Sequence, residues 1–287
     1  FSPGGGEVQL LETKKHLEKK GWLVESYNQW NPTSEASIFH HFSIRAGAEF
    51  PMVEYKNLGK KVALSTILWV EYAKGTGPYD YVRKILGLAD GLLTNSDAES
   101  EKLSRAFDLD RKKFHKTRNG ISETYLDTST TKDFRQSFSI ESEFVLSVAN
   151  FDRRKNTHSL VESCKRLGKK LVLIGHIRDQ KYYDEFKNSY DGMRFLGPVS
   201  DTDLLKSAFQ ECEIFALPSL CETPGIAALE AASQGAKIVI TNEGPTEEYF
   251  NEHVTYVDPL DLNSITDGII CELNSKRDPL KLVKHVT

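Results

Sequence analysis

The chain has 287 residues, of which 39% are hydrophobic and 27% charged, and its formal net charge is −4. This length fits two domains of ordinary size, and the composition is that of a folded globular protein rather than a disordered one. No apolar run approaches the roughly 18 residues of a membrane-spanning helix, and a slightly acidic chain gives no sign of binding nucleic acid. The chain begins at Phe1 rather than Met, which leaves a preceding residue or strand open.

The four cysteines lie in the second half and form neither a Cys-x-x-Cys pair nor a pattern with nearby histidines. This usage favours a reduced chain without a disulfide framework, and it does not indicate a zinc site. We therefore expect no bound metal.

The first half alternates strand and helix patterns. Helices are expected at residues 8–20 and 97–106, and strands at 22–25, 38–42, 61–64 and 91–94. A polar stretch at 128–142 indicates a linker, so we expect one domain over residues 1–138 and another over residues 139–287.

The second half alternates more regularly. Short apolar runs predict strands at 143–150, 170–175, 193–197, 214–218 and 237–241, and helical patterns lie between them. Such alternation is typical of β-α-β units and a parallel sheet. We therefore expect an α/β protein with two Rossmann-like, doubly wound domains that face each other across a cleft, with ligands beyond the carboxyl ends of the strands.

The most informative segment is 217–230, where a strand ends and a helix begins near Pro224 and Gly225. The free N–H groups of such a helix start can bind phosphate, and glycine lets a ligand approach the backbone. Glu222 precedes the turn, and Glu230 lies in an otherwise apolar helical stretch, where a buried carboxylate needs donors such as a ribose diol. A solvent-facing glutamate is the competing interpretation of Glu230.

A basic segment, Arg153, Arg154 and Lys155, follows the first strand of the second half. Cations at a strand end can neutralise a diphosphate leaving group, although an exposed basic loop would look the same. The glycines before the first helix could approach an anion, but they lack the Gly-x-Gly-x-x-Gly and P-loop patterns. The loop at 241–248 could touch the same ligand or simply start a helix.

Other features carry less weight. Asp108 and Asp110 have the spacing of a metal-binding pair but lie in a charged stretch, and the neighbouring His40 and His41 point to opposite faces of a strand. No nucleophile elbow supports Ser/His/Asp hydrolysis. A basic helix face, which is either solvated or in contact with a membrane surface, is formed by Lys14, Lys15, Lys19 and Lys20.

Taken together, these segments resemble the retaining glycosyltransferases of family 4, also called group 1, which have the GT-B fold. The resemblance extends over nearly the whole chain, and its most specific element is the pair Glu222 and Glu230 with seven residues between them. In that family the first glutamate contacts the donor sugar and the second the nucleotide ribose. The resemblance implies that Lys155 binds the donor phosphates and that the loop of Gly5 and Gly6 approaches them.

The resemblance implies catalytic roles for Glu222 and Lys155. The donor-binding residues that it implies are Gly5, Gly6, Asn150, Arg154, Lys155, Pro224, Gly225, Ile226 and Glu230. Asn150 stands where the family usually has an arginine, so Arg153 or Arg154 is expected to substitute. The family's first-domain histidine has no counterpart in residues 65–69, and we assign it none.

The implied function is transfer of a sugar from a nucleotide diphosphate sugar, UDP- or GDP-linked, to a glycan or lipid-linked acceptor with retention of configuration. The implied setting is polysaccharide biosynthesis in the cytoplasm, with a peripheral contact at the inner membrane face left open. No metal or other cofactor is expected, because the nucleotide sugar is a substrate. The alternatives are a nucleotide-sugar epimerase of the same fold and a noncatalytic sugar-nucleotide-binding protein, whereas a nicotinamide-dependent oxidoreductase lacks its glycine fingerprint.

Overall fold

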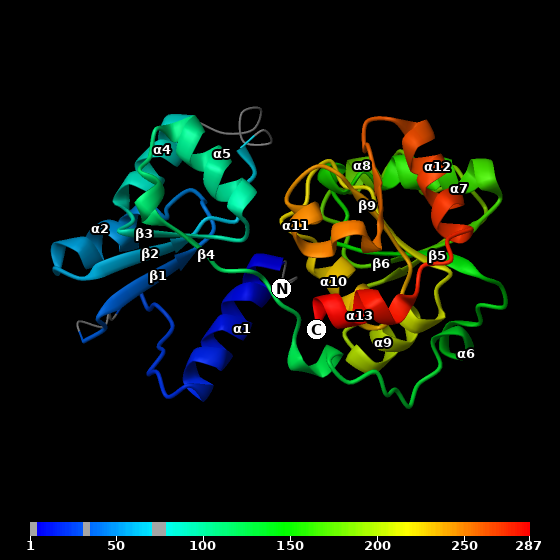
Figure 1. Ribbon diagram of the computed structural model, residues 1–287, viewed down its shortest axis with the longest axis horizontal. Coiled ribbons are helices and arrows are strands. Elements are labelled where there is room, and N and C mark those ends of the chain that lie inside the picture. The colour runs from blue at the N-terminus through cyan, green and yellow to red at the C-terminus, as the bar shows by residue number, and fades with distance from the viewer. Residues whose placement is uncertain (1–4, 31–34, 71–78) are drawn as a thin grey trace. The chain divides into compact units, whose positions relative to one another are not determined.

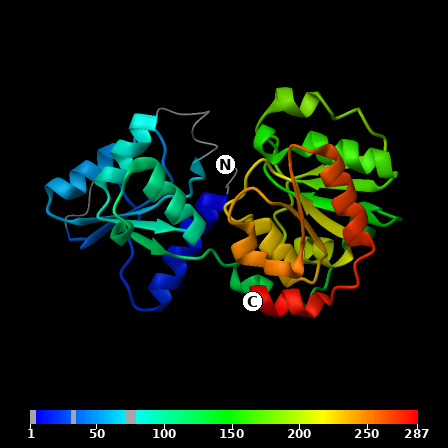
Figure 2. The ribbon, with the colours of Figure 1, turned by 45° about the horizontal axis from the view of Figure 1, so that its top comes forward.

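The computed structural model describes residues 5–30, 35–70 and 79–287. The chain divides into two compact units, Phe1–Asn119 and Gly120–Thr287, called unit 1 and unit 2 below. In Figures 1 and 2 each unit is a twisted sheet with helices packed against it.

Unit 1 contains a parallel sheet of four strands in the order β1-β2-β3-β4. The register pairs Phe39 with Val62 and Leu64 with Leu92, and these side chains enter a core that also contains Met52 and Phe107. The strands are β1 Ile38–Phe42, β2 Lys61–Ser65, β3 Gly91–Thr94 and β4 Phe114–Lys116. The helices are α1 Gly5–Lys19, α2 Glu49–Asn57, α4 Tyr79–Leu88 and α5 Asp97–Phe107.

Unit 2 contains a parallel sheet of six strands in the order β10-β9-β8-β5-β6-β7. The strands are β5 Phe144–Val148, β6 Lys170–Ile174, β7 Met193–Gly197, β8 Ile214–Leu217, β9 Ile238–Thr241 and β10 Thr255–Val257. The helices are α6 Phe134–Phe138, α7 Thr157–Leu167, α8 Gln180–Asp184, α9 Thr202–Glu211, α10 Ile226–Ser233, α11 Thr246–Phe250, α12 Leu262–Leu273 and α13 Pro279–Val286.

Both faces of the unit 2 sheet are covered, which explains why its strands read as continuous apolar runs. Within β5, Phe144 and Leu146 join one core cluster and Val145 joins the other, because successive side chains of a strand point to opposite faces. Helices α7, α8 and α12 cover one face, and α6, α9, α10 and α13 cover the other (Figure 1). The unit is therefore doubly wound.

The strand order of unit 2 reverses at β5. From β5 the chain builds outward through β6 and β7, and it then returns to the other side of β5 with β8, β9 and β10. In open parallel sheets the carboxyl ends of the strands at such a reversal form the ligand-binding crevice. The loops that follow β5 and β8 are therefore the first place to look for a site in this unit.

The predicted strands of the second half and three of the four in the first half are confirmed by β1 to β3 and β5 to β9. The strand expected at 22–25 is wrong, because residues 22–28 form neither helix nor strand and the side chain of Leu23 is 89% exposed. A strand needs a neighbour for its hydrogen bonds, and this segment pairs with none of the strands of unit 1.

The linker region packs with unit 2 in the structure. The sequence places a domain boundary after Phe138, whereas the division by contacts falls after Asn119. Tyr125 and Phe134 are buried in a core cluster of unit 2. The polar residues of the linker hold it to α9.

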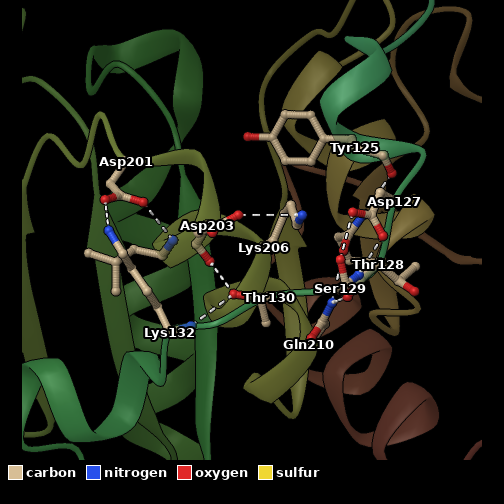
Figure 3. Close-up of polar contacts among 12 residues, drawn as sticks. Tyr125, Asp127, Thr128, Ser129, Thr130, Lys132, Asp201, Asp203, Lys206 and Gln210 are labelled. Atoms are coloured by element: carbon tan, nitrogen blue, oxygen red, sulfur yellow. Dashed lines mark hydrogen bonds and ion pairs between the residues drawn. The ribbon is translucent and has the colours of Figure 1, made fainter.

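Figure 3 shows these contacts. Thr130 donates to the carbonyl of Asp203 at 3.1 Å, Gln210 donates to the carbonyl of Thr128 at 2.7 Å, and Lys132 pairs with Asp201. The polar composition that indicated a linker therefore serves to attach this segment to a helix.

Candidate functional site

The loop after β8 carries the densest group of sequence-predicted residues. The Thr223–Pro224 peptide bond is cis, and Gly225, at the N-terminal end of α10, has a φ of +93°. A Cβ at Gly225 would lie 3.3 Å from Leu217 Cδ2 and 3.6 Å from the Glu222 side chain, so glycine is suited to this position on two grounds. The Gly225 backbone therefore passes close to the Glu222 side chain just before α10 begins.

Glu222 is buried and paired with Lys155. Glu222 is 4% exposed, and the Lys155 ammonium donates to its Oε1 at 2.5 Å. Burial alone would raise the pKa of the Glu222 carboxyl, but the ammonium of Lys155 and, after it, the guanidinium of Arg154 hold that pKa below its usual value. Two segments 67 residues apart in sequence therefore meet as a charged pair at the switch point of the sheet.

The structure separates the two arginines before Lys155. Arg153 is exposed, pairs with Glu185 and lies 5.2 Å from the centre of the Tyr182 ring. Arg154 is partly buried, and its Nη1 donates to the carbonyl of Cys221 at 3.3 Å. Arg154, rather than Arg153, is thus the arginine that lies beside the Glu222 loop, whereas Asn150 lies partly buried in the loop after β5.

Glu230 lies on α10, partly buried. Burial raises the pKa of its carboxyl to about 8. Within the part of the chain that the structure describes, no hydrogen bond or ion pair satisfies this carboxylate. Its charge contributes, after burial itself, to the raised pKa of the Tyr125 phenol, so these two side chains are near each other. A partly buried carboxylate without a donor is suited to accept hydrogen bonds from a hydroxyl-bearing ligand.

Gly244 supports the site, and sequence reasoning missed it. The loop after β9 contacts Glu222 through the backbone, because the Glu222 N–H donates to the carbonyl of Glu243 at 3.1 Å. Gly244 has a φ of +115°, and a Cβ there would lie 2.1 Å from the Glu222 carbonyl oxygen. The sequence assigned the loop at 241–248 to ligand contact or a helix start, but it also buttresses the Glu222 loop. The order Glu243, Gly244 and Pro245 is the feature of the sequence that could have indicated this support.

Gly5 and Gly6 belong to unit 1 and form the first turn of α1 rather than a loop before it. The start of the predicted glycine loop lies outside the described residues. A Cβ on Gly6 would lie 3.5 Å from Ile67 Cδ1, which is ordinary van der Waals contact. The position therefore tolerates a methyl group sterically.

The remaining unit 1 candidates have structural partners. His40 Nε2 lies 2.9 Å from Ser65 Oγ, and burial, with a smaller contribution from His41, lowers the pKa of His40 to about 4. Asp110 caps a short turn by accepting from the Lys112 N–H at 2.9 Å. Among residues 5–30, 35–70 and 79–287, no group of three or more His, Cys, Asp and Glu side chains is arranged to hold a metal ion.

Among the proteins to which this chain is similar, three are informative. The chain is 26% identical over 194 residues to an uncharacterised glycosyltransferase of Methanocaldococcus jannaschii. The matched region covers 62% of this chain and 49% of that protein. The chain thus spans about half the length of this curated relative. It is similar to the structure of Anabaena HepE in complex with UDP, with a TM-score of 0.76 and 16% identity over 99% of this chain and 90% of that one.

The third relative is WaaG, a glycosyltransferase involved in lipopolysaccharide biosynthesis, with a TM-score of 0.72 and 13% identity over 100% of this chain and 91% of that one. These similarities, with the two parallel-sheet α/β units, establish the expected GT-B fold. A family model described as glycosyl transferases group 1 matches residues 129–285, more than half of the chain and nearly all of unit 2. The chain belongs to the group 1 glycosyl transferases.

Proposed function

We propose that this protein transfers a sugar from a nucleotide diphosphate sugar to a glycan or lipid-linked acceptor, with retention of anomeric configuration. The observation that carries the proposal is the buried Lys155–Glu222 pair at the switch point, next to the Gly225 turn and on the same segment as Glu230. A pair at that position places a cation that can bind a phosphate directly beside a carboxylate that can bind a sugar hydroxyl.

The donor diphosphate binds to Lys155 and Arg154 and to the N–H groups of the Gly225 turn. These groups neutralise the charge that develops on the departing nucleotide diphosphate, which is electrostatic stabilisation of a leaving group. The ribose binds to Glu230, whose carboxylate accepts hydrogen bonds from the two ribose hydroxyls. Glu222 orients the sugar, and no metal ion takes part.

The proposed chemistry is a front-face substitution. The bond between the anomeric carbon and the phosphate oxygen breaks, and the acceptor hydroxyl oxygen bonds to the same face of that carbon. The acceptor proton passes to the departing phosphate oxygen, so no covalent sugar–enzyme intermediate is needed. Lys155 acts on the leaving group, which makes its position relative to Glu222 important for rate.

Two relatives support the choice of substrates. HepE has been crystallised with UDP and with UDP-glucose, which supports a uridine diphosphate sugar as the donor, with a GDP-sugar as the second choice. WaaG acts in lipopolysaccharide biosynthesis, which supports a glycan or lipid-linked acceptor and a role in surface polysaccharide assembly in the cytoplasm. Over the described residues, no helix has the length and apolar character needed to cross a bilayer.

A peripheral membrane contact would bring the protein to a lipid-linked acceptor. The candidate surface is the lysine-bearing part of α1, a helix with no buried residue. Two of its lysines are paired with glutamates, Lys14 with Glu18 at 3.8 Å and Lys15 with Glu12 at 3.4 Å, which reduces its attraction to anionic lipid. Sedimentation with anionic and neutral vesicles tests this part of the proposal, and equal binding to both contradicts it.

The transfer reaction is tested by incubating the protein with UDP-, GDP- and ADP-sugars, with and without a lipid-linked or glycan acceptor. The proposal predicts acceptor-dependent release of one nucleoside diphosphate and a product with the donor's anomeric configuration. Isomerisation of the donor without acceptor would instead identify an epimerase. Binding without turnover for every donor and acceptor would identify a noncatalytic binding protein.

A further inference from the structure

Asn156 makes more long-range contacts than its position beside Lys155 suggests. Its Nδ2 donates to the carbonyl of Pro218 at 3.1 Å and to the carbonyl of Pro259 at 2.8 Å. Its Oδ1 accepts from the Ser159 hydroxyl at 2.8 Å. This assignment of the amide is fixed by chemistry, because the two carbonyl oxygens can only accept and so must face the NH₂ group.

Two of these bonds, those to Pro218 and Pro259, connect loops that come from different strands of the sheet, whereas the bond with Ser159 lies within the first turn of α7. Pro218 directly follows β8, Pro259 follows β10, and Asn156 itself lies between the loop after β5 and α7. The backbone adds a third link, because the Leu220 N–H donates to the carbonyl of Arg154 at 2.8 Å. The loop that carries Lys155 is therefore tied to the loop that carries Glu222 on both sides of Lys155.

The backbone at Asn156 is also unusual. Its φ of +52° and ψ of +33° lie in the left-handed region, which asparagine tolerates better than most residues and glycine adopts without strain. This conformation ends the short turn Arg153–Lys155 and starts α7. Glycine would keep this backbone shape and would remove only the side-chain bonds.

We propose that Asn156 is the positioning residue of the donor site: its side-chain amide holds the Lys155 loop against the Glu222 loop, so that the cation for the phosphate and the carboxylate for the sugar keep one fixed distance. The inference rests on the proposed function for its effect on turnover. In this proposal Asn156 acts through the two loops rather than by contact with the donor. Its effect on the Lys155–Glu222 pair exists in the free protein and can be measured without any substrate.

The test compares Asn156→Gly with the wild type and with a matched control, Ser139→Gly. Ser139 has nearly the same left-handed backbone, with φ of +51° and ψ of +54°, and it ends α6 rather than a site loop. Both substitutions place glycine at a compatible left-handed position, so their direct effects on backbone freedom are matched. Only Asn156→Gly removes bonds between the site loops.

The first readout is the pKa of the Glu222 carboxyl, measured by ¹³C NMR of the folded protein without ligand. Lys155 is a cause of the lowered pKa of this carboxyl, so a looser pair raises it in Asn156→Gly and leaves it unchanged in Ser139→Gly. An unchanged Glu222 pKa in Asn156→Gly overturns the inference, whatever the protein's activity. This result is independent of whether the chain is a transferase.

The second readout is transfer, measured with the donor and acceptor found for the wild type. We expect kcat to fall about tenfold or more in Asn156→Gly, because small misplacements of a catalytic cation are costly, and to stay within about twofold in Ser139→Gly. A raised Glu222 pKa with unchanged kcat overturns the positioning role in transfer. Absence of transfer in the wild type counts against the proposed function, and the NMR readout still decides the link between the loops.

Ser159→Ala provides a second variant if Asn156→Gly does not fold. It removes only the bond that orients the amide oxygen of Asn156, in the first turn of α7. We expect a smaller rise of the Glu222 pKa and a loss of about two- to threefold in kcat. If Ser159→Ala shows neither the rise in the Glu222 pKa nor the loss in kcat, the inference is overturned.

Discussion

Lys155 and Glu222 hold opposite charges in contact at a depth where neither is well hydrated, with side chains 13% and 5% exposed. Removing one member of such a pair leaves the other charge buried without compensation. Breaking the pair should therefore lower stability as well as activity. An exposed ion pair behaves differently, because water already screens it.

Lys155→Met is expected to lower the free energy of unfolding by about 3 kcal/mol, measured by urea denaturation at pH 7. The double variant Lys155→Met/Glu222→Gln should recover part of this loss, because the second change removes the uncompensated charge. Arg153→Ala is the control, since its pair with Glu185 is exposed, and it should change stability little. A loss in Lys155→Met no larger than in Arg153→Ala would show that the pair is not buried in solution.

The lowered pKa of Glu222 also fixes the sign of a pH effect. A carboxyl whose folded pKa lies below its usual value of 4.5 stabilises the fold above pH 4.5, and this stabilisation is lost as pH falls through the folded pKa. The wild type should therefore lose stability on acidification below pH 4.5 more than Glu222→Gln does. Parallel stability curves for the two proteins over this range would contradict the assignment.

The raised pKa of Glu230 predicts that donor binding depends on pH between pH 6 and 8. Its pKa is about 8 in the free protein, and two ribose hydroxyls can donate only to oxygens that a proton does not occupy. Nucleotide affinity should rise as pH increases from 6 to 8 and level off above 8, because binding then requires no proton release. Glu230→Gln should bind more weakly and show a flatter profile, and an equally steep profile in that variant would remove Glu230 from the ribose site.

At the scale of elements, three loops of unit 2 come together at one edge of the sheet. The loops after β5, β8 and β9 meet through Lys155, Glu222 and Gly244, although each follows a different strand. Parallel strands bring their carboxyl ends to one edge of the sheet, and the reversal beside β5 opens that edge. The sheet therefore positions the residues, and backbone contacts between the loops hold them there.

Gly244→Ala tests the support that the β9 loop gives to Glu222. The added Cβ would lie 2.1 Å from the Glu222 carbonyl oxygen, so the loop has to move. We expect nucleotide binding to weaken about tenfold or more through displacement of Glu222. Gly168→Ala is the matched control, since Gly168 also has a positive φ but has nothing within 4 Å of an added Cβ, and it should leave binding unchanged. Equal effects of the two substitutions would point to backbone strain alone.

The sequence predicted the strands well where the pattern is local. Runs such as residues 144–146 and 214–217 are apolar because both faces of the sheet are covered, and that signal survives in the sequence alone. The three-residue strands β4 and β10 are too short to produce a pattern. The segment at 22–25 looked like a strand because it has three apolar residues in a row. Such a run does not reveal whether a neighbouring strand is available to pair with it.

The contacts of the site could not be predicted in the same way. Asn156 reaches Pro218 and Pro259, 62 and 103 residues further along the chain, through a side-chain amide that looks like any other in sequence. The separation of Arg153 from Arg154 also depends on which side chain faces Glu185, a residue of another loop. Residue types indicated the chemistry, whereas the pairing of partners required the fold.

At the scale of the whole molecule, the role that the sequence resemblance implies for Gly5 and Gly6 stays a prediction. Lys155, Glu222 and Glu230 belong to unit 2, and Gly5 and Gly6 belong to unit 1. Gly6→Ala adds a methyl group in ordinary contact with Ile67, so the fold of unit 1 should tolerate it. If Gly6 allows close approach to the donor phosphates, transfer should fall about tenfold while affinity for the nucleotide alone changes less than threefold. Transfer at the wild-type rate would remove Gly6 from the site.

We expect the edge of unit 2 beside Lys155, Glu222 and Glu230 to bind a nucleoside diphosphate sugar. The most direct measurement is calorimetric titration of the intact protein with UDP, GDP, ADP and NAD, repeated on Lys155→Met and Glu230→Gln, with Arg153→Ala as the control. We predict that one nucleoside diphosphate binds selectively, that both site variants weaken its binding about tenfold or more, and that the control variant does not. Binding of NAD alone, or nucleotide binding that neither site variant changes, would contradict it.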